Sequence, residues 1–173
     1  MITQEYLKDA FSYDPETGVF IWKIRPLHHF KNTKGMNIFN SQFAGKIAGS
    51  NHTNGYLEVG LSNKGYLLHR LAWVYCHNFL PKDIDHINGI KTDNRLCNLR
   101  EANRSENNQN QKVARTDNKL GILGIFFIKS RNRFVAQIGL NNKRIHLGYF
   151  KTAEEAHQAY LTEKRKIHDF NTL

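Results

Sequence analysis

The sequence predicts an α+β fold in two small parts, and three observations support this prediction. Apolar runs with the alternation of strands are separated by turn signals in both halves of the 173-residue chain. Two segments, residues 68–79 and 151–170, instead carry apolar residues at helical spacing. The polar stretch "NNQNQKVARTDNKLG" between the parts is typical of a linker. We therefore expect one domain over residues 1–111, a linker over 112–120 and a second domain over 121–173.

The first part is predicted to begin with a short helix in "YLKDAFSYD", residues 6–14, followed by a turn and a strand in "PETGVFIWKI". The runs "GYLEVGL" and "GYLLH" flank the turn "SNKG", which indicates a β-hairpin. From Leu68 to Phe79 the apolar residues recur at helical spacing, and we expect Pro81 to end this helix.

The second part is predicted to be a three-stranded antiparallel sheet followed by one helix. The runs "LGILGIFFI", "RFVAQIGL" and "KRIHLGYF" are rich in β-formers and are separated by the short turns "KSRN" and "NNK". Thr152 and Glu155 have the spacing of a capping box, and Ala156 and Tyr160 give the helix an apolar face. One face of the sheet is left open.

The composition is that of a globular protein with an anionic partner. Hydrophobic residues make up 40% and charged residues 23%, and 25 Lys and Arg against 15 Asp and Glu give a net charge of +10. Residues 112–173 carry twelve basic and five acidic side chains, so the second part is the more basic one. This charge favours nucleic acid, because each neutralised phosphate releases a counterion.

Other classes of protein are disfavoured. No stretch has the length of a membrane span and the N-terminus lacks the form of a signal peptide, so we expect a cytoplasmic protein in a bacterial or phage-infected cell, with no membrane partner. Cys76 and Cys97 form no Cys-x-x-Cys pair, which argues against a zinc ribbon or a disulfide framework. Both are expected to be small core residues.

Chemistry is concentrated in "IDHINGIKTDNRLCNLREANRSENNQN", residues 84–110, which predicts a strand, a loop, a strand and a helix capped by Asn103 and Glu106. Asp85 and His86 at the end of the strand can converge with an Asn of the helix. Oxygen ligands suit Mg²⁺ or Mn²⁺, and a neutral His can take a proton from water near pH 7. The alternative is that Asp85 and His86 only cap a turn.

This stretch resembles the HNH motif of phage and intron-encoded homing endonucleases, and the likeness extends to "GYLLHRLAWVYCHNFLP" and "YDPETGVFIWK". The resemblance implies a ββα-metal (His-Me finger) nuclease core, with Asp85 and Asn107 as ligands of Mg²⁺ or Mn²⁺. It makes His86 the general base and Asn98 a structural amide that orients it. Asn108, beside Asn107, is the alternative ligand.

A His-Arg pair, His69 and Arg70, also matches this branch of the family. The resemblance does not fix the role of either residue: the pair supports the site, contacts phosphate or stabilises the fold. His69 is a candidate catalytic residue, for which support of the site and phosphate contact are weighed equally, and Arg70 is a candidate DNA contact.

The C-terminal part resembles the APETALA or ethylene-response-factor type of DNA-binding domain over residues 121–170. In that family the sheet enters the major groove. Alternation in "RFVAQIGL" puts Phe134, Ala136 and Ile138 on one face and Val135, Gln137 and Gly139 on the other. The candidate DNA contacts of this part are Lys129, Arg131, Arg133, Gln137, Lys143, Arg144 and His146.

Together the resemblances imply a homing-type DNA endonuclease that leaves 3′-hydroxyl and 5′-phosphate ends and nicks one strand per monomer. Its partner is expected to be double-stranded DNA, with no small-molecule substrate, and the protein is expected to be a monomer or a weak dimer. Two alternatives remain: a DNA-binding regulator with an inactive nuclease core, and an RNA-binding or structural protein. The second alternative explains the charge but not the spacing of the metal-site residues.

Overall fold

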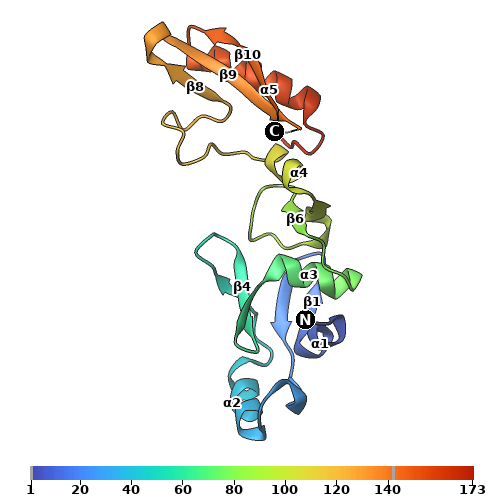
Figure 1. Cartoon of the computed structure of the whole chain (residues 1–173). Coiled ribbons are helices and arrows are strands. Elements are labelled where there is room, and N and C mark those ends of the chain that lie inside the picture. Colours follow the sequence, from blue (N-terminus) through green and yellow to red (C-terminus); the bar gives the residue numbers. More distant parts are fainter. Residues whose placement is uncertain (1, 142) are drawn as a thin grey trace. The chain divides into compact units, whose positions relative to one another are not determined.

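A computed structural model describes residues 2–141 and 143–173, and its architecture is α+β, as predicted (Figure 1). The chain folds into two compact units, Met1–Glu101 and Ala102–Leu173. These units are defined by packing alone, so the functional boundaries at residues 111 and 121 stay a prediction. Within the described residues, no helix is both long and apolar enough to cross a membrane.

The N-terminal helix is shorter than predicted. Helix α1 (Gln4–Ala10) is capped by Thr3, and strand β1 (Phe11–Asp14) follows it directly. The prediction of helix over residues 11–14 was wrong because this segment pairs with β2 (Val19–Trp22) in an antiparallel ladder. Its alternating burial places Phe11 and Tyr13 against the rings of β2, and this packing outweighs the helical propensity.

A second helical region was not predicted. The short 3₁₀ turn η1 (Leu27–His29) precedes α2 (Thr33–Phe43), whose first turn is capped by the side chain of Asn32. None of the residues of α2 is fully buried, but Phe39 and Phe43 pack against the apolar core of the first unit, Phe39 against the ring of Trp22. The apolar residues of α2 do recur at helical spacing, but Gly35 and the Asn and Ser residues among them lower the helical propensity of the segment.

The predicted hairpin and the helix after it are present. Strands β3 (Ser50–Asn51), β4 (Leu57–Leu61) and β5 (Lys64–Leu67) form a three-stranded antiparallel sheet, and α3 (Leu68–His77) starts where β5 ends. The helix stops earlier than expected. Asn78, with φ of 60°, adopts the left-handed conformation and its N–H bonds to the carbonyl of Val74, so it ends the helix before Pro81 can.

The polar stretch folds as predicted into strand, loop, strand and helix. Strands β6 (Asp83–His86) and β7 (Leu99–Ala102) form a two-stranded sheet, with the 3₁₀ turn η2 (Leu96–Asn98) before β7. Helix α4 (Arg104–Gln109) follows, and its capping box joins Asn103 to Glu106. The first unit packs around apolar residues of α1, β1, β2, β4 and α3, to which Ile84 and Leu99 add the two strands of the polar stretch.

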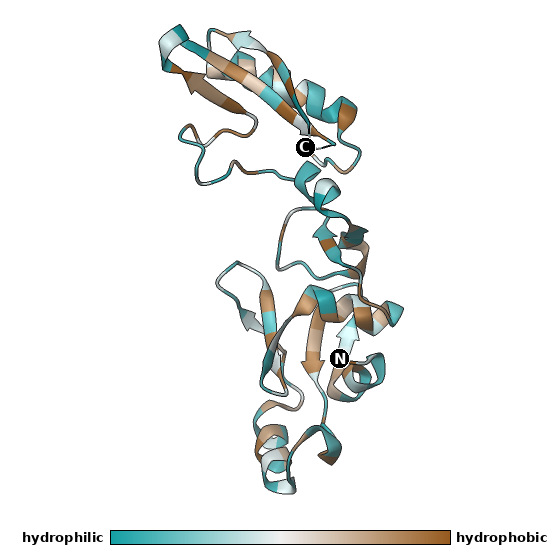
Figure 2. Cartoon of the chain, viewed as in Figure 1, coloured by the Kyte–Doolittle hydropathy of each residue, from teal (hydrophilic) through white to brown (hydrophobic). Residues whose placement is uncertain are grey.

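The second unit contains the predicted sheet and helix. Strands β8 (Ile125–Ile128), β9 (Arg133–Leu140) and β10 (Lys143–Phe150) form an antiparallel sheet, with the 3₁₀ turn η3 (Lys129–Arg131) between the first two. Helix α5 (Ala153–Ile167), with its capping box, lies along one face of this sheet (Figure 1). Figure 2 shows hydrophobic residues along the whole of β8.

The predicted alternation of β9 is confirmed on the helix side. Ala136 and Ile138 are buried against Ala156 and Tyr160 of α5, and Phe134 packs at the margin of the same cluster. Val135, on the opposite face, is also buried, although α5 does not cover that face. It lies between Phe126 and Tyr149, its partners in the neighbouring strands, so an apolar row crosses the open face.

The residues before β8 are held by the second unit. The buried Lys164 of α5 donates a hydrogen bond to the carbonyl of Gln111, and the hydroxyl of Thr172 donates to the side chain of Asn110 at 2.8 Å. Asn118 donates to the carbonyl of Ile122 at 2.7 Å. Residues 112–120 have no helix or strand, and within them Asn118 is held by this bond, while Asn110 and Gln111 are held just before them. Their role as a linker stays a prediction.

One expectation about the core was wrong. Cys97 is exposed and Cys76 is only half-buried, and neither forms a disulfide. Cys97 lies in the 3₁₀ turn that precedes β7, where the chain runs along the surface. The apolar character of a cysteine does not decide its burial when its neighbours are loop residues.

Candidate functional site

Strand β6 places Asp85 and His86 at the edge of the first unit's core. Both side chains are buried, each with 5% of its surface exposed. Ile84 anchors the strand in the apolar core, and residues 87–98 then form the loop that leads to β7. A carboxylate and an imidazole next to each other in this setting are unusual, because polar groups are rarely buried without a partner or a function.

The amide of Asn98 ties the two ends of this loop together. Its Oδ1 accepts the backbone N–H of Asn88 at 2.9 Å, and its Nδ2 donates to the carbonyl of Asp93 at 2.8 Å. The N–H of Ile87 bonds to the carbonyl of Asn98, also at 2.9 Å. These bonds fix the chain directly after His86.

Asp93 is the second anchor of the loop. Arg95 reaches it with two hydrogen bonds, of 2.8 and 2.6 Å, and Asn88 donates to it at 2.6 Å. These hydrogen bonds, with that of the Arg95 side chain foremost, lower the pKa of Asp93 to about 2. The loop is therefore held by a charged network, which sequence reasoning had treated as ordinary turn chemistry.

The loop also rests on the turn between β1 and β2. The Tyr13 hydroxyl donates to the carbonyl of Asn94 at 2.8 Å, and the N–H of Leu96 bonds to the carbonyl of Pro15 at 2.9 Å. Gly18 has φ of +74°, and a Cβ built on it would lie 2.5 Å from the Arg95 nitrogen. Only glycine fits this close approach.

Asn94 contacts His86 and was missed from the sequence. Its side chain is 1% exposed, and its Oδ1 lies 3.4 Å from Nε2 of His86. With an oxygen at this position, Nε2 is the donor and the basic lone pair of the ring lies on Nδ1. Burial lowers the pKa of His86, so the ring is neutral near pH 7, as a general base must be. The spacing from His86 carried no signal for Asn94.

The structure brings His69 to His86. His69 lies in the first turn of α3, is 5% exposed, and its ring centre is 4.9 Å from that of His86. Tyr56 packs against both imidazoles, with its ring centre 5.0 Å from that of His69 and 5.8 Å from that of His86. Burial, and then the nearby His86 and Arg70, lower the pKa of His69 to about 3, so this ring is neutral.

Arg70 lies beside His69, but its guanidinium forms hydrogen bonds within the first unit. Its guanidinium donates to the carbonyls of Lys82 and Pro81 at 3.3 and 3.4 Å. These long bonds hold the turn after α3, while the half-buried side chain keeps contact with solvent. Its predicted contact with DNA stays a prediction.

Asp85 has a basic partner that sequence reasoning also missed. Arg100, on β7, donates from Nε and Nη2 to the same carboxylate oxygen, Oδ2, at 2.9 and 2.7 Å. The pairing follows from the sheet, because β6 and β7 are neighbouring strands. An arginine two residues beyond Asn98 had no assigned role in the motif.

Asn107 belongs to the second unit. It lies in α4, is half-buried, and its N–H bonds to the carbonyl of Asn103 at 2.9 Å within the first turn. Asn108 is exposed. Asp85 and Asn107 therefore come from different units, and their joint binding of a metal stays a prediction. The donor types fit Mg²⁺ or Mn²⁺, since a buried carboxylate and an amide oxygen are hard ligands.

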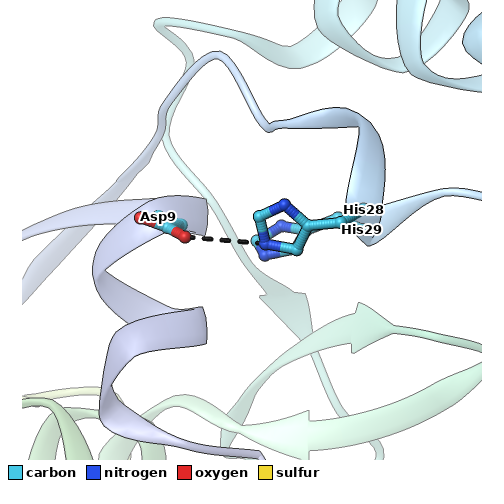
Figure 3. A group of neighbouring side chains, drawn as sticks. All are labelled: Asp9, His28 and His29. Carbon is cyan, nitrogen blue, oxygen red and sulfur yellow. Dashed lines mark ion pairs between the residues drawn. The ribbon is translucent and has the colours of Figure 1, made fainter.

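A second polar cluster, Asp9, His28 and His29, is the one grouping of three acidic, His or Cys side chains that could surround an ion within the described residues (Figure 3). Nε2 of His28 is 3.7 Å from Oδ2 of Asp9. However, Nδ1 of His29 accepts a hydrogen bond from Arg25 at 3.3 Å, which leaves the proton on Nε2. The Arg25 guanidinium also repels a cation, so we do not assign a metal to this cluster.

The candidate DNA contacts of the second unit gather on the open face of its sheet. In the strand register Gln137 pairs with His146, and Arg144 pairs with Gly139, so these side chains share the face opposite α5. Arg133 lies on the same face of β9 by alternation. The exposed Lys129 and Arg131 come from η3, at the end of β8.

Two details of this face differ from the expectation. Lys143 is exposed, but it alternates with Arg144 and therefore lies on the face that carries α5, at the hairpin end of the strand. Tyr149, which the sequence did not single out, lies on the open face. The guanidinium of Arg131 is 5.0 Å from its ring centre, and the ring centre of His146 is 4.7 Å from it. An exposed ring between basic groups is a common feature of surfaces that bind nucleic acid.

One comparison with known proteins gives a match. Residues 66–109 match the model of a family described as HNH endonuclease. This match supports the prediction of an HNH nuclease, a class of hydrolases that act on DNA. The match runs from β5 to the end of α4 and covers well under half of the chain. No curated protein and no solved structure matches the chain. The homing type and the APETALA-type second domain stay predictions.

Proposed function

We propose that the protein is a metal-dependent DNA endonuclease of the homing type. The observation that carries the proposal is the buried Asp85–His86 pair at the end of β6, next to a loop that the Asn98 amide fixes, within the segment that matches HNH endonucleases. A structural turn would not require a neutral, buried histidine next to a buried carboxylate.

In the proposed reaction His86 takes a proton from a water molecule through Nδ1, while Nε2 stays on Asn94. The water oxygen attacks the phosphorus, the bond to the 3′ oxygen breaks, and the leaving 3′ oxygen takes a proton from solvent, which gives a 3′-hydroxyl and a 5′-phosphate. Asp85 and Asn107 would hold Mg²⁺ or Mn²⁺, which supplies charge stabilisation for the phosphate and the leaving oxygen. Asn98 keeps the loop, and with it His86, in place. His69 supports the ring of His86 from α3.

The second unit is proposed to bind double-stranded DNA through the open face of its sheet, in the manner that the APETALA-type resemblance implies. Support comes from the basic and aromatic side chains on that face and from the excess of basic residues in this part of the chain. A β-sheet fits the major groove, which is about 12 Å wide. Gln137 is the candidate for a contact with adenine, since Gln can pair with its edge in two places.

The test is nicking of supercoiled plasmid by the full chain with Mg²⁺ or Mn²⁺. We expect wild type to produce the open circular form and His86→Ala to lose at least 100-fold in rate, as the removal of a general base does on the order of 10²–10⁴. Asn108→Ala is the control and should cut like wild type. No cutting by wild type despite DNA binding would instead support a DNA-binding regulator with an inactive core. Equal cutting by wild type and His86→Ala would contradict the role of His86.

A further inference from the structure

The pairing of Arg100 with Asp85 bears on how the proposed metal site is filled. The Arg100 guanidinium directs two hydrogen bonds at one oxygen of the carboxylate, and the Asp85 side chain is 7% exposed against 23% for Arg100. The arginine therefore covers the carboxylate on one side and retains some access to solvent. A positive group already stands beside the carboxylate that a cation would use.

Two cations beside one buried carboxylate repel each other strongly, because solvent screens little there. A divalent ion that binds Asp85 must therefore either tolerate the guanidinium or displace it. Arginine binds phosphate with the same planar geometry as carboxylate, so a DNA phosphate can compete with Asp85 for it. The exchange would remove the repulsion when substrate arrives.

We propose that Arg100 is a charge placeholder that weakens metal binding to Asp85 in the absence of DNA and couples metal uptake to substrate binding. In the free protein Arg100 neutralises the buried carboxylate. When DNA binds, the guanidinium turns to a backbone phosphate and Asp85 becomes available to the metal. This inference rests on the proposed function, in particular on Asp85 as a metal ligand.

The experiment is a calorimetric titration of the full chain with Mn²⁺, with and without a duplex that carries non-hydrolysable phosphate linkages. Without DNA, we expect Arg100→Gln to bind Mn²⁺ at least ten-fold more tightly than wild type. Arg100→Lys, which keeps the charge, should stay within a few-fold of wild type. With the duplex, wild type should bind Mn²⁺ at least ten-fold more tightly, and Arg100→Gln should gain much less.

Arg115→Gln is the matched control, because Arg115 also pairs with an aspartate, Asp117, and lies outside the proposed ligand set and the loop after His86. It should leave Mn²⁺ affinity unchanged. Weaker or unchanged binding by Arg100→Gln would overturn the proposal and make Arg100 a simple orienting residue. If that variant does not fold, wild type alone decides, since no gain in Mn²⁺ affinity on adding the duplex also overturns it. Loss of the site itself is judged separately: Mn²⁺ binding by Asp85→Asn equal to wild type would refute Asp85 as a ligand and hence the proposed function.

Discussion

The side chain of Asn98 is a single group on which the geometry of the β6–β7 loop depends. It uses both its acceptor and its donor within the loop, to Asn88 and Asp93. Asn98→Ala removes one hydrogen bond from each of two backbone groups, and each such loss costs about 1–3 kcal/mol when the group is buried. We expect lower stability in urea unfolding and slower nicking, because the chain after His86 is released.

Asn98→Asp keeps the acceptor for the N–H of Asn88 but loses the donor and places a carboxylate against the carbonyl of Asp93. Its free energy of unfolding should therefore be no higher than that of Asn98→Ala. Asn108→Ala, an exposed change, should stay within about 0.5 kcal/mol of wild type. Full stability of Asn98→Ala would show that the Asp93 network and the contacts with Tyr13 and Pro15 hold the loop without the Asn98 amide.

His69 gives a pH dependence of known sign. Its pKa in the folded protein is about 3, below the ordinary value of 6.5, so between these values the unfolded chain binds a proton that the folded chain does not. The contribution of His69 is therefore fully present above about pH 6.5 and is lost as the pH falls toward 3. From pH 7 to pH 5 the loss is about 2 kcal/mol for a shift of this kind.

Urea unfolding at pH 7 and pH 5 measures this loss, with His69→Phe as the comparison. The phenylalanine keeps an aromatic ring packed against both Tyr56 and His86 and removes the titrating group. The variant should lose about 2 kcal/mol less than wild type between the two pH values. An equal loss in both proteins would assign the acid sensitivity to other histidines, such as His29, whose pKa is lowered to about 4 by burial.

The sequence singled out the motif residues but not the groups that hold them. Asp85 and His86 could be found because their order and spacing form a pattern. Asn94 could not be found, because it contacts His86 only when the loop closes. Arg100 could not be found, because it contacts Asp85 only when β7 pairs with β6. Contacts across a loop or a sheet depend on register, and register is not visible in one short polar stretch.

Elements were predicted well where a strong local signal existed. The hairpin turn at Ser62 and Asn63, both with positive φ, and the capping boxes of α4 and α5 are local features that one stretch of sequence contains. The segment Phe11–Asp14 was misassigned because its partner strand, β2, decides its conformation. Helix α2 was missed because Gly35 and several Asn and Ser residues lower its helical propensity.

Lys164 of α5 holds the chain that precedes the sheet, through a hydrogen bond to Gln111. The residue is 1% exposed, bonds to the carbonyl of Gln111, and burial lowers its pKa to about 8, with a further contribution from Lys112. Between this value and the ordinary 10.5, the unfolded chain binds the proton that the folded chain has lost. The stability of the second unit should therefore rise from pH 7.5 to 9.5, by about 2 kcal/mol.

Lys164→Met should abolish this rise, since methionine fills similar space and does not titrate. Lys166→Met, on the same helix but exposed, is the matched control and should keep it. The measurement is thermal or urea unfolding at the two pH values, followed by a probe in the second unit. A rise that survives in Lys164→Met would place its origin elsewhere in the chain.

At the scale of the whole molecule, charge is the property that sequence and structure relate most directly. The basic excess of residues 112–173 was visible in the sequence, and the structure gathers much of it on the open face and turns of one sheet. The ligand pair Asp85 and Asn107 was predicted from the resemblance to the HNH motif, and its two members belong to different compact units. A measurement of metal binding tests this pair.

The salt dependence of DNA binding tests the role of the second unit in the intact chain. Each phosphate contact that is lost reduces the slope of log K against log salt by about one. Four exposed basic residues, changed together to Gln, form the test variant: Lys129, Arg131, Lys143 and Arg144. A second variant removes the same charge from exposed lysines of the first unit: Lys31, Lys34, Lys46 and Lys64.

Both variants have the same net charge, so general attraction to DNA falls equally in each. If the second unit contacts the backbone, the first variant should lose up to about four units of slope and the control markedly less. Fluorescence anisotropy with a labelled duplex at several salt concentrations gives both slopes. Equal slopes would mean that the basic sheet contributes only long-range charge, and DNA contact would then have to be sought in the nuclease part.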